Sequence, residues 1–314
     1  MTRVGAIDCG TNSIRLLIAD VDPGSGMLTD LVRRMEIVRL GHGVDKTGVI
    51  APEAMARTLA QAREYAAQCS ELGVERVRFV ATSASRDARN AQEFVDGVGE
   101  AFGAFGVTPD VVTGHEEASL SFHGATGDLR ANDIPGPYLM VDLGGGSTEF
   151  VRGTDDVEQA RSVDVGCVRM TERHLRGDPP TPGQIAAAVV DVEAAIDQAA
   201  EVVGFQGIST LVGLAGSITT ITAHALRLTR YEPEKIHLSM LPSAQIIDAC
   251  TSLLSMTRAE RAALPFMHAG RVDVIGAGGL VWSTIVQRLQ HEAGISQVVT
   301  SEHDILDGIA ISIA

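Results

Sequence analysis

The most informative part of the sequence reads Leu139-Met140-Val141-Asp142-Leu143-Gly144-Gly145-Gly146-Ser147-Thr148-Glu149-Phe150-Val151. Apolar, β-prone residues on both sides of a glycine-rich break predict a β-hairpin. Three consecutive glycines carry no Cβ, so the backbone N–H groups of the turn can approach an oxyanion such as phosphate. Asp142 and Glu149 flank the turn from its two strands, where they can hold Mg²⁺ together with phosphate oxygens. The alternative interpretation is a flexible turn between two solvated acids.

A second copy of this pattern opens the chain, as Val4-Gly5-Ala6-Ile7-Asp8-Cys9-Gly10-Thr11-Asn12-Ser13-Ile14-Arg15-Leu16-Leu17-Ile18. The two copies align without a gap, since Asp8 stands 134 positions before Asp142 (142 − 8) and Ser13 stands 134 before Ser147 (147 − 13). One repeat at so long a period indicates a duplicated domain and not a solenoid. We therefore expect each copy to present one turn to a shared cleft.

Composition describes a globular chain of 314 residues, 45% hydrophobic and 21% charged, long enough for one large or two ordinary domains. No apolar run is long enough to span a membrane, and the strand pattern around Asp8 leaves no room for a secretory signal. The four cysteines lack any Cys-x-x-Cys spacing, which argues against a structural zinc site and for a reducing compartment. The sequence thus predicts a soluble cytoplasmic protein without a membrane partner.

The formal net charge of −15 bears on the class of ligand. A nucleic-acid-binding protein normally carries a basic patch or stripe, and none is evident here, so no nucleic-acid partner is expected. The same acidity is unfavourable for a polyanionic substrate. A phosphate site in this chain must therefore rely on local donors, glycine backbone and a divalent cation.

Two further segments follow predicted strands of the first half. Thr82-Ser83-Ala84-Ser85-Arg86 lies at the carboxyl end of strand 77–81, where ligands bind in open α/β sheets. Its hydroxyls and Arg86 suit phosphate, although a helix start with an exposed arginine is an alternative. Glu116 and Glu117 begin a helix, where acids are usually solvated and favoured by the helix dipole. Adjacent helical residues point about 100° apart, so one glutamate can face the cleft while the other faces solvent.

Other features give weaker signals. Residues 127–137 are rich in turn formers and predict a linker between the two halves. The helix beginning at Gly166-Cys167 offers its N-terminus to an anion, with Arg169 in reach. A third glycine turn, 213–217, also follows a strand. Arg33, Arg34 and Arg39 either line an anion path or lie on a solvated strand face.

Six ordered motifs resemble those of the exopolyphosphatase/guanosine pentaphosphate phosphatase (Ppx/GppA) family, part of the actin–sugar kinase–heat-shock ATPase superfamily. They are residues 6–13, 80–86, 114–118, 141–149, 166–168 and 212–216, and together they cover nearly the whole chain. The resemblance implies an α/β fold of two actin-like (ribonuclease H-like) domains, each with a mixed five-stranded sheet, and an interdomain cleft that holds the active site. We expect one domain to span 1–126 plus the C-terminal helix within 301–314, and the other to span 127–300. A homodimer is a further expectation from the resemblance.

The resemblance also implies roles for individual residues. The family's catalytic glutamate matches Glu117, and its metal-binding and water-orienting carboxylates match Asp142 and Glu149. The expected phosphate contacts are Thr11, Asn12, Ser13, Arg86, Gly144, Gly145, Gly146 and Ser147. The implied chemistry is Mg²⁺- or Mn²⁺-dependent hydrolysis in which Glu117 takes the proton from an attacking water.

Several substrates and functions remain in competition. The first expectation is hydrolysis of the terminal phosphate of inorganic polyphosphate, and the alternative is hydrolysis of guanosine pentaphosphate (pppGpp). Longer family members continue into a domain similar to HD phosphohydrolases, whereas this sequence stops at Ala314, which favours short polyphosphates or pppGpp. A kinase of the same superfamily would need a sugar-binding domain, and the small second half argues against it. A non-catalytic polyphosphate or alarmone sensor would have no need of Glu117.

Overall fold

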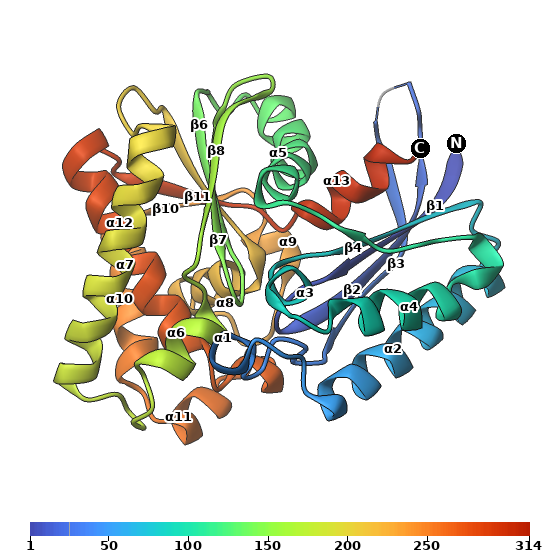
Figure 1. The fold of residues 1–314 in the computed structure, drawn as a ribbon. Helices are drawn as coiled ribbons and strands as arrows, with labels where there is room; N and C mark the ends of the chain where they lie inside the picture. Colours follow the sequence, from blue (N-terminus) through green and yellow to red (C-terminus); the bar gives the residue numbers. More distant parts are fainter. Residues whose placement is uncertain (25) are drawn as a thin grey trace. The chain divides into compact units, whose positions relative to one another are not determined.

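A computed structural model describes residues 1–24 and 26–314, which form two compact units. Unit 1 comprises Met1–Gly124 and Ile305–Ala314, and unit 2 comprises Ala125–Asp304. The boundaries between the units thus fall after residues 124 and 304, whereas the expected boundaries were after residues 126 and 300. Each unit is an α/β layer structure built on one mixed sheet (Figure 1).

The sheet of unit 1 has five strands in the order β3-β2-β1-β4-β5. The strands β1, β2 and β3 form an antiparallel meander, β4 runs parallel to β1, and β5 runs parallel to β4. The strands are β1 (Thr2–Cys9), β2 (Ser13–Val21), β3 (Leu28–Ile37), β4 (Arg76–Ala81) and β5 (Asp110–Val111). The helices are α1 (Val44–Thr47), α2 (Pro52–Glu71), α3 (Ser83–Asp87), α4 (Ala91–Ala101), the 3₁₀ turn η1 (Gly103–Phe105), the start of α5 (Gly114–Ala131) and α13 (Ile305–Ser312).

The central strand β1 is buried on both faces of this sheet, and its alternate residues point to opposite sides. On β1, Ile7 and Cys9 join the core beneath α2 and α4, while Val4 and Ala6 pack against α13 (Figure 1). Arg33 on β3 forms an ion pair with the fully buried Asp307 of α13, which fixes that helix to the sheet. Arg34 bonds to Glu36 and Gln68, so these two arginines serve the fold of unit 1.

The sheet of unit 2 repeats this topology with one strand added, in the order β10-β11-β9-β6-β7-β8. The run β8-β7-β6-β9-β11 corresponds to β3-β2-β1-β4-β5, with the same antiparallel and parallel pairings, which confirms the duplicated actin-like fold. The expectation of five strands is wrong for this unit, because β10 pairs antiparallel with β11 at the edge.

The strands of unit 2 are β6 (Tyr138–Leu143), β7 (Thr148–Gly153), β8 (Val157–Val163), β9 (Thr210–Leu214), β10 (Ser239–Pro242) and β11 (Gln297–Thr300). Its helices are the rest of α5, α6 (Cys167–Arg173), α7 (Pro182–Val203), α8 (Ala215–Ala225), α9 (Pro233–Ile236), α10 (Ser243–Ser255), α11 (Arg258–Ala262), the 3₁₀ turn η2 (Ala269–Arg271) and α12 (Ile275–Ala293). No helix of the described chain is both long enough and apolar enough to cross a membrane.

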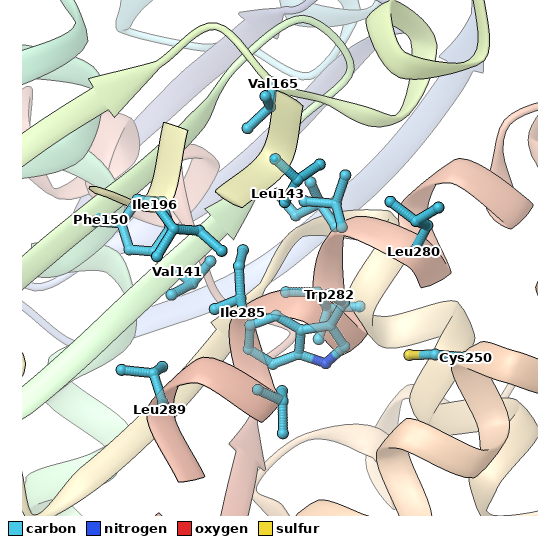
Figure 2. Packing of buried hydrophobic residues seen from close by; sticks show 14 of the residues in the cluster. Val141, Leu143, Phe150, Val165, Ile196, Cys250, Leu280, Trp282, Ile285 and Leu289 are labelled. Carbon is cyan, nitrogen blue, oxygen red and sulfur yellow. The ribbon is translucent and has the colours of Figure 1, made fainter. Parts of the chain in front are cut away.

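The core of unit 2 contains Trp282, whose ring lies beside Ile285 of the same helix, α12 (Figure 2). Gly213 of β9 makes this packing possible, because a Cβ there would stand 2.9 Å from the indole ring. Gly279 likewise admits Cys250, whose carbonyl oxygen would lie 2.9 Å from an added Cβ. Glycine at these two positions therefore permits close packing in the core of unit 2.

One local prediction needs correction. Residues 127–131 are helical and not a linker, since α5 continues to Ala131 through its turn-forming residues. Asn90 precedes α4, and its side-chain amide bonds to the backbone N–H and C=O of Ile50. A capping box of Thr181 and Gln184 begins α7.

Candidate active site

In unit 1 the β1–β2 turn is held from behind by the segment that follows β3. The carbonyl of Thr11 accepts from the N–H of Gly41, and the carbonyl of Asn12 accepts from the N–H groups of Val38 and Arg39. Gly41 is required at this contact, because a Cβ there would stand 2.4 Å from Cγ2 of Thr11. Within the described chain, the N–H groups of Thr11 and Asn12 make no hydrogen bond.

In unit 2 the β6–β7 turn is held in the same way by α6. The carbonyl of Gly144 accepts from Cys167 N–H, and that of Gly145 accepts from the N–H groups of Val168 and Arg169. The Arg169 side chain completes the set, with Nε donating to the carbonyl of Gly146 at 2.6 Å. All three glycine carbonyls of the turn therefore point toward α6.

Peptide planarity then determines where the turn's donors point. In a trans peptide the C=O of one residue and the N–H of the next face opposite ways. Because the carbonyls of Gly144, Gly145 and Gly146 point toward α6, the N–H groups of Gly145, Gly146 and Ser147 face away from it. These three N–H groups have no hydrogen-bond partner among the described residues, although Ser147 is buried. Consecutive unsatisfied amides of this kind form an anion-binding concavity.

This arrangement corrects one prediction about α6. We expected the α6 N-terminus to bind an anion with help from Arg169, but its first N–H groups are used by the glycine carbonyls. The helix acts instead on the shape of the turn. Gly166 is essential here, since a Cβ would lie 2.5 Å from the carbonyl oxygen of Gly145.

Two carboxylates stand at the base of this turn. Asp142 and Glu149 are direct cross-strand partners on β6 and β7, and their residues are only 7% and 1% exposed. Ser162 on β8 donates its hydroxyl to Glu149 Oε1 at 2.6 Å. Like charges directly opposite on a sheet repel each other, so a cation bound to both carboxylates would reduce this repulsion.

In unit 1 the positions equivalent to Asp142 and Glu149 hold an acid and a base. There the register pairs Asp8 with Arg15, and the Arg15 guanidinium donates to Asp8 Oδ2 at 2.7 and 2.9 Å. Arg15 is the counterpart of Glu149 in the 134-residue repeat (149 − 15). The two turns therefore share a backbone pattern but differ in charge. The β1–β2 turn is flanked by an ion pair, and the β6–β7 turn is flanked by two acids.

The second cluster of unit 1 joins Arg86 and Glu117. Arg86 on α3 donates Nη1 to the carbonyl of Val112 at 2.9 Å and to Glu117 Oε2 at 3.1 Å. The Nε and Nη2 donors of Arg86 make no hydrogen bond to another described residue. Helix α3 adjoins the β1–β2 turn, because a Cβ added to Gly41 would touch both Thr11 and Ala84.

Glu117 and its neighbour Glu116 separate as helix geometry predicts. Glu117 is 8% exposed and faces Arg86, while Glu116 is exposed and pairs with Arg78. Glu117 thus lies at the first turn of α5 with its carboxylate fixed by an arginine that retains donors for another anion.

Cysteine chemistry is absent from both turns. Cys9 ends β1 beside the first turn, and Cys167 begins α6 beside the second. Burial raises the pKa of both thiols, so both stay protonated at neutral pH and neither supplies a nucleophile.

One residue of interest was missed by the sequence analysis. Arg271 belongs to η2 and donates Nη1 to Thr220 of α8 at 2.9 Å. Its guanidinium lies across the third glycine turn, since a Cβ on Gly216 would come within 2.1 Å of Nη2. The only sequence signal for this contact is Gly216, because a larger residue there would clash with the Arg271 guanidinium.

The predicted site residues thus form one set in each unit. Unit 1 holds Thr11, Asn12, Ser13, Arg86 and Glu117, and unit 2 holds Asp142, Gly144, Gly145, Gly146, Ser147 and Glu149. A duplicated α/β sheet whose glycine turn presents unpaired N–H groups next to buried acids is typical of a phosphate-handling protein. Its family follows from comparison with known proteins.

The chain belongs to the Ppx/GppA phosphatase family, whose profile matches residues 17–312. It is 49% identical to exopolyphosphatase 2 of Mycobacterium tuberculosis over 100% of this chain and 99% of that protein. A crystal structure of an exopolyphosphatase-like protein superposes with a TM-score of 0.94 at 44% identity, covering 99% of this chain and 97% of that one. The guanosine-5'-triphosphate,3'-diphosphate pyrophosphatase of Photobacterium profundum is 28% identical over 94% of this chain and 53% of its own length. The protein is therefore a phosphatase.

Proposed function

We propose that this phosphatase is an exopolyphosphatase, which hydrolyses the terminal phosphate of inorganic polyphosphate, with short chains preferred. The observation that carries the proposal is the β6–β7 turn, where three unsatisfied N–H groups lie between two buried acids. The full-length similarity to a protein named exopolyphosphatase 2 supports the choice of polyphosphate.

The terminal phosphate binds through backbone and arginine donors in this proposal. Its oxygens accept from the N–H groups of Gly145, Gly146 and Ser147 in unit 2. The resemblance to the family implies further phosphate contacts in unit 1, at Thr11, Asn12, Ser13 and Arg86. Such preorganised donors stabilise the charge on a transferred phosphoryl group without reorganisation. They also offset the repulsion that a net charge of −15 exerts on a polyanion.

Asp142 and Glu149 fit Mg²⁺ or Mn²⁺. Both are hard oxygen donors, they are cross-strand neighbours, and no arginine occupies the position that Arg15 fills in unit 1. A cation bound there would neutralise the two acids and the phosphate oxygens beside them. Ser162 holds Glu149 in place for this role.

Glu117 is the general base of the proposed reaction. It takes a proton from water as the water oxygen bonds to the terminal phosphorus and the phosphoanhydride P–O bond breaks, releasing orthophosphate and the shortened chain. Arg86 orients the Glu117 carboxylate through Nη1 and offers its remaining donors to the phosphate. A positioned base of this kind accelerates a reaction by about 10²–10⁴-fold.

Hydrolysis of pppGpp is the second candidate. It is favoured by the family relationship to guanosine-5'-triphosphate,3'-diphosphate pyrophosphatases, although this chain spans only about half of such a relative. Both reactions break a terminal phosphoanhydride, so the catalytic residues are the same and the substrate's far end differs. The buried free cysteines agree with a cytoplasmic location, and a homodimer stays a prediction.

Phosphate release decides between these functions. The protein is incubated with tripolyphosphate, with longer polyphosphates of graded length, and with pppGpp, each with and without Mg²⁺. We expect fastest release from short polyphosphates and loss of release without the cation. A preference for pppGpp would favour the second candidate, and release from none of the substrates would support a sensor.

A further inference from the structure

A second cluster of metal-ligating side chains lies within unit 2, away from the glycine turn in sequence. It consists of Asp128 on α5, His237 at the end of α9 and His303 in the β11–α13 connection. One ligand atom from each residue lies within 4.8 Å of the other two. All three are partly exposed, which leaves the cluster accessible to an ion from solvent.

We propose that Asp128, His237 and His303 bind a transition-metal ion such as Zn²⁺. Imidazole and carboxylate together suit Zn²⁺, Co²⁺ or Ni²⁺, whereas Mg²⁺ prefers all-oxygen surroundings. Three protein ligands leave a fourth position for water, as in open zinc sites. The proposal is independent of the proposed function, whose cation lies at Asp142 and Glu149.

Two of the three separations between ligand atoms are close to those that a metal requires. Around tetrahedral Zn²⁺ with bonds of about 2.0–2.1 Å, neighbouring ligand atoms stand roughly 3.3 Å apart. Asp128 Oδ2 lies 2.5 Å from His303 Nδ1 and 3.6 Å from His237 Nε2. To bind the ion, the Asp128–His303 distance must increase and the Asp128–His237 distance must decrease, each by less than about 1 Å. Rotation of the side chains can produce both changes. The ion replaces the proton shared by His303 and Asp128.

The backbone around the two histidines is already fixed. Ser301 Oγ accepts from the N–H of His303 and donates to its carbonyl, which holds that turn in place. The N–H of Leu238 donates to the carbonyl of Thr300, so the segment after His237 is tied to the segment before His303. The rings of His237 and His303 lie 4.6 Å apart between centroids.

One existing contact must be given up. The N–H of Glu302 donates to His237 Nδ1 at 3.3 Å, a long hydrogen bond that places the ring proton on Nε2. Ligation through Nε2 moves that proton to Nδ1, and the contact with Glu302 is lost. We therefore expect affinity below that of a closed structural zinc site.

The location suggests what the ion does. Asp128 follows shortly after the chain enters unit 2, and His303 comes just before the chain leaves it. A metal bound to both would hold together the unit 2 ends of the two connections. The ion is therefore a structural clamp and not a reactant.

Cobalt binding to the full-length protein tests the proposal. Co²⁺ is titrated in millimolar Mg²⁺, which saturates the oxygen ligands of Asp142 and Glu149, and the visible d–d absorption is followed. We expect one Co²⁺ per chain with a four- or five-coordinate spectrum. Each of His237→Gln, His303→Gln and Asp128→Asn should weaken binding at least about 10-fold. The control His291→Gln, an exposed histidine of the same unit, should bind as the wild type does.

X-ray absorption spectroscopy of the wild-type protein with Zn²⁺ provides a second readout that does not depend on a variant's folding. We expect two imidazole ligands and oxygen scatterers without sulfur. Equal Co²⁺ binding by wild type and all three variants, or a zinc site without imidazole, would overturn the proposal. Absence of any bound Co²⁺ at micromolar concentrations would do so as well.

Discussion

Asp142 and Glu149 lie directly opposite each other on β6 and β7, both buried, whereas the equivalent positions of unit 1 hold the ion pair of Asp8 and Arg15. Both units contain the same hairpin, but Arg15 of unit 1 is replaced by Glu149 in unit 2. The unit 1 pair is complete in itself. In the proposed function, a cation bound to both acids would stabilise the unit 2 pair.

Glu149→Gln tests this difference in charge. The amide keeps the contact with Ser162 but removes the repulsion from Asp142, so metal-free stability should rise by up to about 1 kcal/mol. Phosphate release should fall by about 10²-fold or more, because a cation site has lost a charge. Thermal unfolding with and without Mg²⁺, beside phosphate release, measures both effects. Glu158→Gln on the exposed face of β8 should change neither.

The complementary change in unit 1 should act on stability first. Arg15→Met leaves Asp8 buried without its cation, a loss that costs about 3 kcal/mol in comparable pairs. Urea unfolding should show this decrease in the free energy of unfolding. A variant as stable as the wild type would mean that Asp8 finds another partner.

Glu117→Gln isolates the proposed base. We expect kcat to fall by about 10²–10⁴-fold with little change in KM, because the amide cannot accept the proton while Arg86 still holds the side chain. Glu116→Gln is the matched control, since its exposed side chain pairs with Arg78 and should leave kcat within a few-fold. Equal turnover in wild type and Glu117→Gln would remove Glu117 from this role.

Gly166→Ala tests whether α6 shapes the phosphate turn. The new Cβ would meet the backbone of Gly145 at 2.5 Å, and backbone cannot rotate away. A displacement of about 1 Å in a positioning element costs on the order of 10²-fold in rate, so kcat/KM should fall by that factor. Gly183→Ala on α7 is the control, because nothing lies within 4 Å of its Cβ and the helix gains about 0.4–1 kcal/mol.

The pH dependence of stability should be visible at Asp191. Hydrogen bonds from His174, and then from Arg173, hold the pKa of this carboxyl below its usual range. A lowered pKa means that the folded state binds fewer protons, so the contribution is complete above the unfolded pKa of about 4 and is lost as pH falls through the folded value. Asp191 is 39% exposed, so the contribution is at most about 1 kcal/mol. The stability difference between wild type and Asp191→Asn should be constant above pH 5 and shrink toward pH 2.

Sequence reasoning recovered the parts of the fold that depend on local pattern. The gapless repeat of Asp8 and Asp142 predicted two hairpins with the same register, and both occur. The edge strand β10 was not predicted, because four residues are too few to show the alternation of apolar and polar residues that marks a strand. Gly127 and Asp128 favoured a linker on propensity, yet α5 continues through them, with Asp128 bonded to His303 in the folded unit.

The parts of the candidate site that depend on tertiary contacts could not be predicted from the sequence. The α6 N-terminus was expected to bind an anion, and only the folded unit shows that its N–H groups hold the glycine carbonyls. Arg271 reaches the third turn from a distant 3₁₀ turn. Asp128, His237 and His303 come from three segments without any metal-binding spacing, so no motif could reveal them.

The central claim is that the β6–β7 turn binds the terminal phosphate beside a cation held by Asp142 and Glu149. A crystal structure of Glu117→Gln with Mn²⁺ and tripolyphosphate tests it directly through the anomalous signal of manganese. We predict a manganese peak in contact with both carboxylates, and a terminal phosphate whose oxygens accept from the N–H groups of Gly145 and Gly146. A phosphate bound elsewhere, or these two carboxylates without manganese, would contradict the account.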